Sequence, residues 1–263
     1  MRKLKILLPV FMLLSGIGGF FIRKNELKTA YDPLTGLSID GAPMLTVMIA
    51  AAAAILALSL LFVIFTPRKY KEIRRYTELF HIEVFAGYLL LLLCGAVITV
   101  SGIYYTVTEV ILLKDYGLLK TAFGILAAAT GIIIAYLASR CYKQRKVGRN
   151  ILYVLPSIFS CVLLIMLYSE NTANPVLTSY CYDCLAYVAC ALTFYYEIAV
   201  IFKKVMPGKL IASYLSASFF EITILAQSDL LPIKLMIGAL AVTHILKCGA
   251  LIRNMTAPSK HKA

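Results

Sequence analysis

The sequence predicts an all-α integral membrane protein, a polytopic bundle of about eight transmembrane helices with both termini in the cytoplasm. Three observations predict this class. Hydrophobic residues make up 61% of the 263 residues and charged residues only 15%, whereas roughly a quarter of a soluble domain is charged. The apolar residues lie in blocks of about 20, the length that a helix needs to cross a bilayer. The basic residues lie mostly between these blocks.

The apolar blocks are expected to form the helices of a single transmembrane domain over residues 1–263. They cover residues 5–22, 44–66, 84–106, 118–139, 150–168, 177–202, 210–227 and 231–252. The first block also resembles a signal peptide, because a basic "MRKLK" precedes it, but no A-x-A cleavage site follows. The segment 23–43 contains the turn signals "YDPLTG" and "IDGAP" and is predicted to be an outer loop that caps the bundle.

Small residues in the middle blocks predict where helices pack together. Without a hydrophobic force between helices in lipid, close approach at small side chains becomes more important. Two stripes have the required spacing, one in block 84–106 and one in block 118–139. They are Gly87, Gly95 and Gly102, and Gly124, Ala128, Gly131 and Ala135. Block 210–227 is the weakest span, because it is short and holds Glu221 and three serines.

The net charge of +13 predicts orientation rather than nucleic-acid binding. With a cytoplasmic N-terminus, 20 of the 26 basic residues lie in inner segments, as the positive-inside rule requires. These are Arg2, Lys3, Lys5, Arg68, Lys69, Lys71, Arg74, Arg75, Arg140, Lys143, Arg145, Lys146, Arg149, Lys203, Lys204, Lys209, Lys247, Arg253, Lys260 and Lys262. Inner loops such as "RCYKQRKVGR" are expected to contact anionic lipid headgroups.

Tyrosine is expected to form the interfacial belt, because the chain contains no tryptophan. Thirteen tyrosines fall near predicted helix ends. Those near outer ends are Tyr104, Tyr105, Tyr116, Tyr168, Tyr180 and Tyr182, and those near inner ends are Tyr70, Tyr76, Tyr142, Tyr153, Tyr195, Tyr196 and Tyr214.

The block 177–202 is an apolar helix that carries two carboxylates, Asp183 and Glu197. They are 14 residues apart, close to four helical turns or about 21 Å, so they point in the same direction at different depths. A charge at the bilayer centre costs roughly 2.5 to 3.5 kcal/mol on insertion scales, so both should face the bundle interior. The same face carries Tyr187, Cys190 and Phe194.

Partners for these carboxylates can be sought by depth. Lys247 should lie within about one helical turn of Glu197, which predicts an ion pair. On these bounds Glu221 and His244 differ in depth by about 8 Å, a gap that an error in the bounds or a bridging water could close. Together these groups predict a polar track through the last three helices. Its residues are Asp183, Tyr187, Glu197, Glu221, His244 and Lys247.

A purely structural interpretation of the same residues stays open. Glu197 and Lys247 could each extend to the membrane surface, since long charged side chains reach the headgroup region from inside a helix. Glu221 could be a neutral acid bonded to a serine such as Ser218.

Cys181 and Cys184 form a C-x-x-C pair, the spacing used by redox enzymes and by metal sites. No second pair and no following histidine complete a zinc or haem motif, and isolated membrane cysteines commonly act as small apolar fillers. We therefore expect no cofactor and no metal.

Function is expected to lie in the polar track, as movement or sensing of a small solute or ion. The alternative is a non-catalytic subunit or scaffold that binds partner helices, and an intramembrane redox enzyme is a third possibility. The sequence favours a non-enzymatic role, since it contains no H-E-x-x-H, G-x-S-x-G or phosphate-binding glycine loop. The expected location is a prokaryotic plasma membrane, with a homo-oligomer or other membrane proteins as partners.

Overall fold

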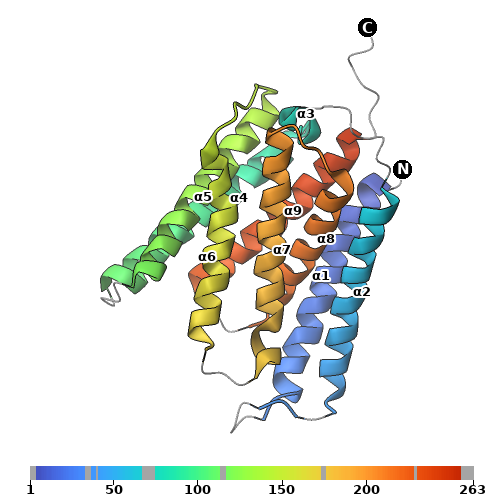
Figure 1. Ribbon diagram of the computed structural model, residues 1–263, viewed down its shortest axis with the longest axis vertical. Helices are drawn as coiled ribbons and strands as arrows, with labels where there is room; N and C mark the ends of the chain where they lie inside the picture. The colour runs from blue at the N-terminus through green and yellow to red at the C-terminus, as the bar shows by residue number, and fades with distance from the viewer. Residues whose placement is uncertain are drawn as a thin grey trace.

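The computed structural model describes residues 4–32, 37–39, 41–66, 75–112, 117–172, 176–227 and 230–255. Within these ranges the protein is a helical bundle, with one isolated β-bridge between Tyr31 and Ser38, which confirms the predicted all-α class (Figure 1). The helices are α1 (Leu4–Thr29), α2 (Pro43–Phe65), α3 (Tyr76–Leu79), α4 (Phe85–Tyr105), η2 (Thr106–Leu112), α5 (Leu118–Tyr142), η3 (Ile151–Val154), α6 (Leu155–Glu170), α7 (Leu177–Ile201), α8 (Pro207–Ile224) and α9 (Leu231–Met255).

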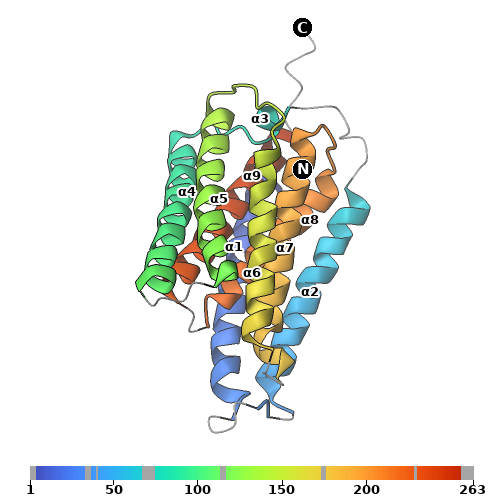
Figure 2. The ribbon, with the colours of Figure 1, turned by 60° about the vertical axis from the view of Figure 1, so that its left-hand side comes forward.

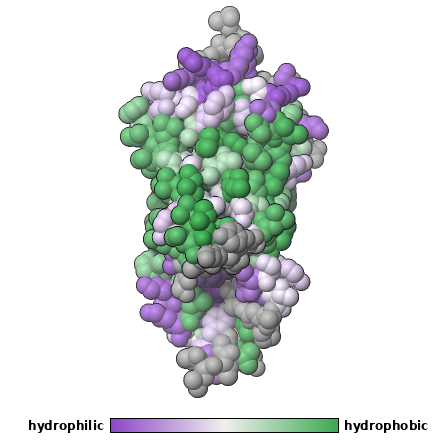
Figure 3. Space-filling view, turned by 90° about the vertical axis from the view of Figure 1, so that its left-hand side faces the viewer, coloured by the Kyte–Doolittle hydropathy of each residue, from purple (hydrophilic) through white to green (hydrophobic). Residues whose placement is uncertain are grey.

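Seven stretches of helix among the described residues are long and apolar enough to cross a membrane. They are Ile6–Thr29, Pro43–Phe65, Phe85–Leu112, Leu118–Tyr142, Ile151–Glu170, Tyr180–Ile201 and Leu231–Met255. Figure 3 shows hydrophobic residues gathered between hydrophilic residues at the two ends of one face. The chain is therefore a multi-pass membrane protein whose outer surface contacts lipid.

The predicted block 210–227 corresponds to α8, which has 18 residues and is not among these seven stretches. Helix α8 packs against α1, α2, α7 and α9, and nearly all its side chains are buried. Because protein rather than lipid covers α8, its serines and Glu221 are tolerated there. The start of α1 and the end of α9 lie at the same end of the bundle (Figure 1). Seven crossings would place these two helix ends on opposite sides of the membrane. We therefore infer that α8 supplies an eighth crossing.

The end of the bundle that holds α3 and the connections 143–150 and 202–206 carries most of the described basic residues. We call it the basic end, and the other the opposite end. Several basic residues assigned to inner segments lie outside the described residues. They are Arg2, Lys3, Arg68, Lys69, Lys71, Arg74, Lys260 and Lys262. At the basic end, α3 is joined to α9, because the Asn254 amide donates to the carbonyls of Leu79 and His81, at 2.9 Å each.

Helices α4 and α5 lie side by side over much of their length (Figure 2), and the predicted small residues form their contact. A Cβ added at Gly95 would lie 2.8 Å from the Gly131 carbonyl oxygen, and one at Gly102 would lie 2.7 Å from the Ala128 nitrogen. Only glycine permits backbones to come this close. Gly87 is different, because its neighbour is the Ile82 side chain.

Helix α1 is longer than predicted, so the outer loop does not begin at residue 23. The helix continues to Thr29 and fully buries Arg23 and Glu26, whose Nη1 and Oε2 atoms lie 2.9 Å apart. The Arg23 guanidinium also lies 4.8 Å from the centre of the Tyr182 ring. The i,i+3 spacing of the charged pair favours continued helix, and no proline or glycine lies between residues 20 and 30.

The prediction of an interfacial tyrosine belt is confirmed for some tyrosines and wrong for others. Tyr104, Tyr168 and Tyr195 are exposed near helix ends, as expected. Five others are buried because their hydroxyl groups or rings have partners inside the bundle: Tyr76, Tyr105, Tyr153, Tyr182 and Tyr214. Tyr70 and Tyr116 lie outside the described residues.

Candidate functional site: a buried polar track

The charged face of α7 is directed into the bundle, as the spacing predicts. Five side chains on this face are buried, each with 7% exposure or less: Asp183, Tyr187, Cys190, Phe194 and Glu197. Helices α6, α8 and α9 provide the surrounding polar groups. The polar track therefore has three levels between the basic end and the opposite end of the bundle.

The level nearest the basic end is centred on Glu197. Lys247 Nζ lies 2.7 Å from Glu197 Oε2, and the hydroxyl group of Tyr214 donates to Glu197 Oε1 at 2.7 Å. The Tyr76 hydroxyl donates to Glu197 Oε2 at 3.3 Å. Burial, followed by the charge of Glu197, raises the pKa of the Tyr76 phenol well above its ordinary value, so this hydroxyl group stays a donor. Glu197 and Lys247 form a buried pair and do not extend to the surface.

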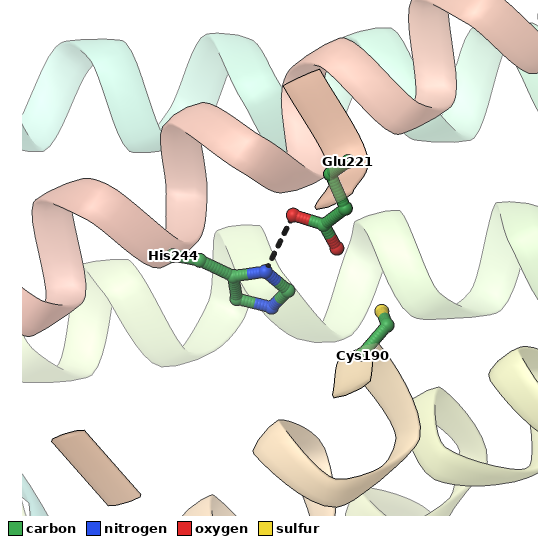
Figure 4. Close-up of side chains that lie close together, drawn as sticks. All are labelled: Cys190, Glu221 and His244. Atoms are coloured by element: carbon green, nitrogen blue, oxygen red, sulfur yellow. Dashed lines mark hydrogen bonds and ion pairs between the residues drawn. The ribbon is translucent and has the colours of Figure 1, made fainter. Parts of the chain in front are cut away.

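The middle level pairs Glu221 of α8 with His244 of α9. The Nδ1 atom of His244 lies 2.9 Å from Glu221 Oε2 (Figure 4). The two residues therefore lie at one depth, and the predicted difference of about 8 Å is wrong because it rested on helix bounds that differ from the observed Pro207–Ile224 and Leu231–Met255. Ser218 is not the partner of Glu221, since its hydroxyl group donates to the Leu215 carbonyl.

Aromatic rings connect the middle level to the level of Glu197. The Phe194 ring lies edge-on to the His244 ring with centroids 5.4 Å apart, and the Tyr214 ring lies 5.8 Å from it. Since the Tyr214 hydroxyl group also bonds Glu197, the Tyr214 side chain contacts both the middle level and the level of Glu197. A cavity of about 10 Å³ borders Phe194, Glu197 and Lys247, a volume close to that needed for one water molecule.

The third level is Asp183, near the opposite end. Its Oδ2 atom accepts a hydrogen bond of 2.9 Å from the Gln227 side chain. Asp183, Tyr187 and Gln227 line an open pocket of about 270 Å³, which we call the outer pocket. Its remaining polar residues are Glu170, Asn171 and Tyr180. The outer pocket is rich in oxygen atoms and contains two carboxylates.

A second pocket, of about 190 Å³, lies at the basic end. Its charged residues are all basic: Arg75, Lys146, Arg149 and Lys203. Tyr76 lines this basic pocket and also bonds Glu197. The polar track thus adjoins a pocket at each end, acidic at one and basic at the other.

The two cysteines of the C-x-x-C pair lie on α7, are both partly buried and form no disulfide with the described cysteines. Among the described residues, the group of three side chains close enough to hold a metal ion does not include them. That group is Cys190, Glu221 and His244. A redox or metal role for Cys181 and Cys184, the less favoured interpretation of the sequence, stays untested.

Sequence reasoning found the charged residues of the site but missed several of their partners. Tyr76 and Tyr214 were assigned to the interface, Gln227 to a helix end, and Arg23 with Glu26 to a loop. The i,i+3 spacing of Arg23 and Glu26 was a usable signal. No local pattern links Tyr76 to Glu197, because the residues are 121 positions apart.

Comparisons with protein-family models, with curated proteins and with solved structures give no match to this chain.

Proposed function

We propose that this multi-pass membrane protein moves a small ion or solute across the bilayer along the polar track. The observation that carries the proposal is the arrangement of buried ionisable groups at three levels of α7, α8 and α9, with a pocket at each end. Such groups within transmembrane segments usually mark ion or substrate pathways.

The energetic cost of burying charged groups supports a functional role for the ionisable residues of the polar track. Removing two charges from water costs several kcal/mol per ion, and a buried ion pair often stabilises a protein no more than apolar residues of similar size. Helix packing alone would therefore not favour Glu197 with Lys247 and Glu221 with His244 over leucines. A pathway that must bind a polar or charged species does favour them.

The charge distribution supports an orientation and a location. We propose that the basic end faces the cytoplasm of a prokaryotic cell, with the protein in the plasma membrane, as the positive-inside rule implies. The outer pocket, with Asp183 and Glu170, then attracts cations from outside. The basic pocket is suited to anionic lipid headgroups, whose attraction is about 1 kcal/mol per basic residue near the surface.

The scaffold alternative is less well supported. In that role the buried charges would bind helices of a partner protein. Here Glu197, Glu221 and Asp183 each bond a residue of the same chain.

Flux through reconstituted vesicles tests the proposal. Vesicles would contain a pH-sensitive dye, or in parallel a dye that responds to divalent cations, and an ion gradient would be applied. Asp183→Asn and Glu221→Gln should each abolish protein-dependent flux, because each removes a charge that would face the permeating species. Unchanged gel-filtration and thermal-melting profiles would show that the variants fold.

Glu83→Gln is the matched control, because Glu83 is exposed and lies outside the polar track. It should leave the flux unchanged. The proposal fails if wild-type vesicles are no more permeable than protein-free vesicles to every probe. It also fails if Asp183→Asn and Glu221→Gln both keep the full flux.

A further inference from the structure

Three side chains that bind transition metals meet at the middle level of the polar track. Cys190 of α7, Glu221 of α8 and His244 of α9 each place a ligand atom within 4.8 Å of the other two. All three are buried, with 2% exposure or less. Figure 4 shows them converging from three helices, with one Glu221 oxygen bonded to His244 and the other pointing toward Cys190.

A second observation indicates that this cluster has unused binding capacity. His244 Nε2 is buried and has no hydrogen-bond partner among the described residues, and Glu221 Oε1 has no nitrogen or hydroxyl donor there, only the nearby Cys190 thiol. An unsatisfied buried polar group destabilises a fold, so the His244 nitrogen calls for an explanation such as a bound ion. The second Glu221 oxygen points into the same cluster, which also contains a thiol and an imidazole.

We propose that Cys190, Glu221 and His244 bind a divalent transition-metal cation of the Zn²⁺ type. One sulfur, one nitrogen and one oxygen ligand suit Zn²⁺ or Co²⁺, whereas Ca²⁺ and Mg²⁺ prefer oxygen ligands alone. Bond lengths of about 2.0 to 2.3 Å place tetrahedral ligand atoms roughly 3.5 Å apart. Side-chain rotation that shortens the widest separation by roughly 1 Å would therefore form the site.

Charge balance fits a divalent ion within the membrane. The Cys190 thiol releases its proton, and the Glu221–His244 pair releases the one proton that it shares, so two protons leave for each cation bound. The product contains a thiolate, a carboxylate, a neutral imidazole and a dication, and is electrically neutral overall. Three protein ligands leave a fourth position for water, as in sites where the metal is exchanged or reactive.

The proposal names the substrate class of the polar track, and in that respect it rests on the proposed function. The outer pocket offers a route, since Tyr187 lines it and lies three residues from Cys190 on the same face of α7. The sequence alone gave no sign of this site, because its three ligands come from three helices and form no short motif.

Metal binding by the full-length protein purified in detergent tests the proposal without any transport assay. Co²⁺ is the spectroscopic probe, because thiolate coordination produces a sulfur-to-cobalt charge-transfer band. We expect one Co²⁺ per chain with this band, displacement of Co²⁺ by Zn²⁺, and no displacement by Mg²⁺ or Ca²⁺. Cys190→Ser should remove the band. Glu221→Gln and His244→Ala should each weaken binding by more than about 10-fold, since even loss of an outer-sphere partner costs 10- to 100-fold.

Cys141→Ser is the matched control, since Cys141 is also buried but lies on α5 outside the cluster. It should bind Co²⁺ as the wild type does. A wild-type spectrum without the thiolate band overturns the proposal, with no need for any variant to fold. A band that survives in Cys190→Ser also overturns it. If proton flux through vesicles persists while no metal binds, the metal site is wrong and the proposed pathway stands.

Discussion

Glu197 has three polar partners in the polar track, and the loss of the acid and the loss of its cationic partner should differ in effect. Its carboxylate accepts from Lys247, Tyr214 and Tyr76. If Lys247 is lost, the carboxylate keeps two hydroxyl donors. If Glu197 is lost, the contact left to the buried ammonium among the described residues is the Phe194 ring, 5.9 Å away, and two hydroxyl groups lose their acceptor. Removing the acid should therefore do more harm than removing the base.

A double-mutant cycle with Glu197→Leu and Lys247→Leu measures this asymmetry. Each single change should lower the free energy of unfolding by about 3 to 5 kcal/mol, because it leaves an uncompensated buried group, with Glu197→Leu the more severe. The double variant should lose markedly less than the sum of the two. Denaturation in micelles gives the three values, and strict additivity would mean that the residues are not coupled.

The exposed pair Arg75 and Glu78 provides the matched cycle. Its charged atoms are 3.9 Å apart and face solvent, where a salt bridge contributes about 0 to 1 kcal/mol. In a cycle of Arg75→Leu, Glu78→Leu and the double variant, the losses of unfolding free energy should be additive, with no measurable coupling energy.

At the level of elements, α4 and α5 form the closest helix pair, and backbone rather than side chains fills the contact. Gly102 faces the backbone of Gly124 and Ala128, and Gly95 faces Gly131 and Ala135. The Thr99 hydroxyl adds a bond to the Ala128 carbonyl across the pair, at 3.3 Å. Since backbone atoms cannot move aside as a flexible side chain can, a single methyl group should separate the helices.

Alanine substitution at two helical glycines should therefore have opposite effects. Gly102→Ala should destabilise the protein by about 1 to 3 kcal/mol, the usual cost of overpacking. Gly18→Ala on α1 has open space around the new methyl group and should stabilise by about 0.5 to 1 kcal/mol through helix propensity. Thermal melting in the same detergent compares them. A Gly102→Ala protein as stable as the wild type would contradict the close contact.

At the scale of the whole molecule, the sequence predicts what depends on local periodicity and misses what depends on helix placement. Block lengths identify the spans, and the face of α7 with Asp183 and Glu197 is predicted correctly because helical periodicity determines it. Contacts between helices are harder to predict from the sequence, because they depend on how the helices are placed relative to one another. Helix bounds estimated from the sequence placed Glu221 and His244 at different depths, whereas the packing of α8 against α9 brings them into a bonded pair.

The same distinction explains why α8 was the least certain span. Hydropathy detects helices that face lipid, whereas α8 is covered by four other helices and needs no apolar surface of its own. Arg23 and Glu26 were missed for a related reason: charges were assumed to end α1, yet each neutralises the other inside the bundle. The predicted span ended at these polar residues, whereas in the structure the helix continues because the two charged side chains pair with each other.

The number of passages has a consequence for topology. With eight passages the connections 143–150 and 202–206 share one side of the membrane with the start of α1, and the end of α6 and the start of α7 lie on the other. The basic end carries Arg140, Arg145 and Lys146, and translocating such short basic loops is disfavoured. The basic end should therefore be cytoplasmic, and the outer pocket should open to the exterior.

Labelling of single introduced cysteines tests this orientation. Arg145→Cys and Thr172→Cys place thiols at exposed positions on opposite ends of the bundle. In intact cells a membrane-impermeant maleimide should label Thr172→Cys and not Arg145→Cys, and permeabilised cells should give both. The unaltered chain sets the background, since its cysteines are buried, partly buried or, for Cys161, on the exposed surface of α6. Labelling of Arg145→Cys in intact cells would reverse the orientation, and with it the assignment of the acidic pocket as the entrance for cations.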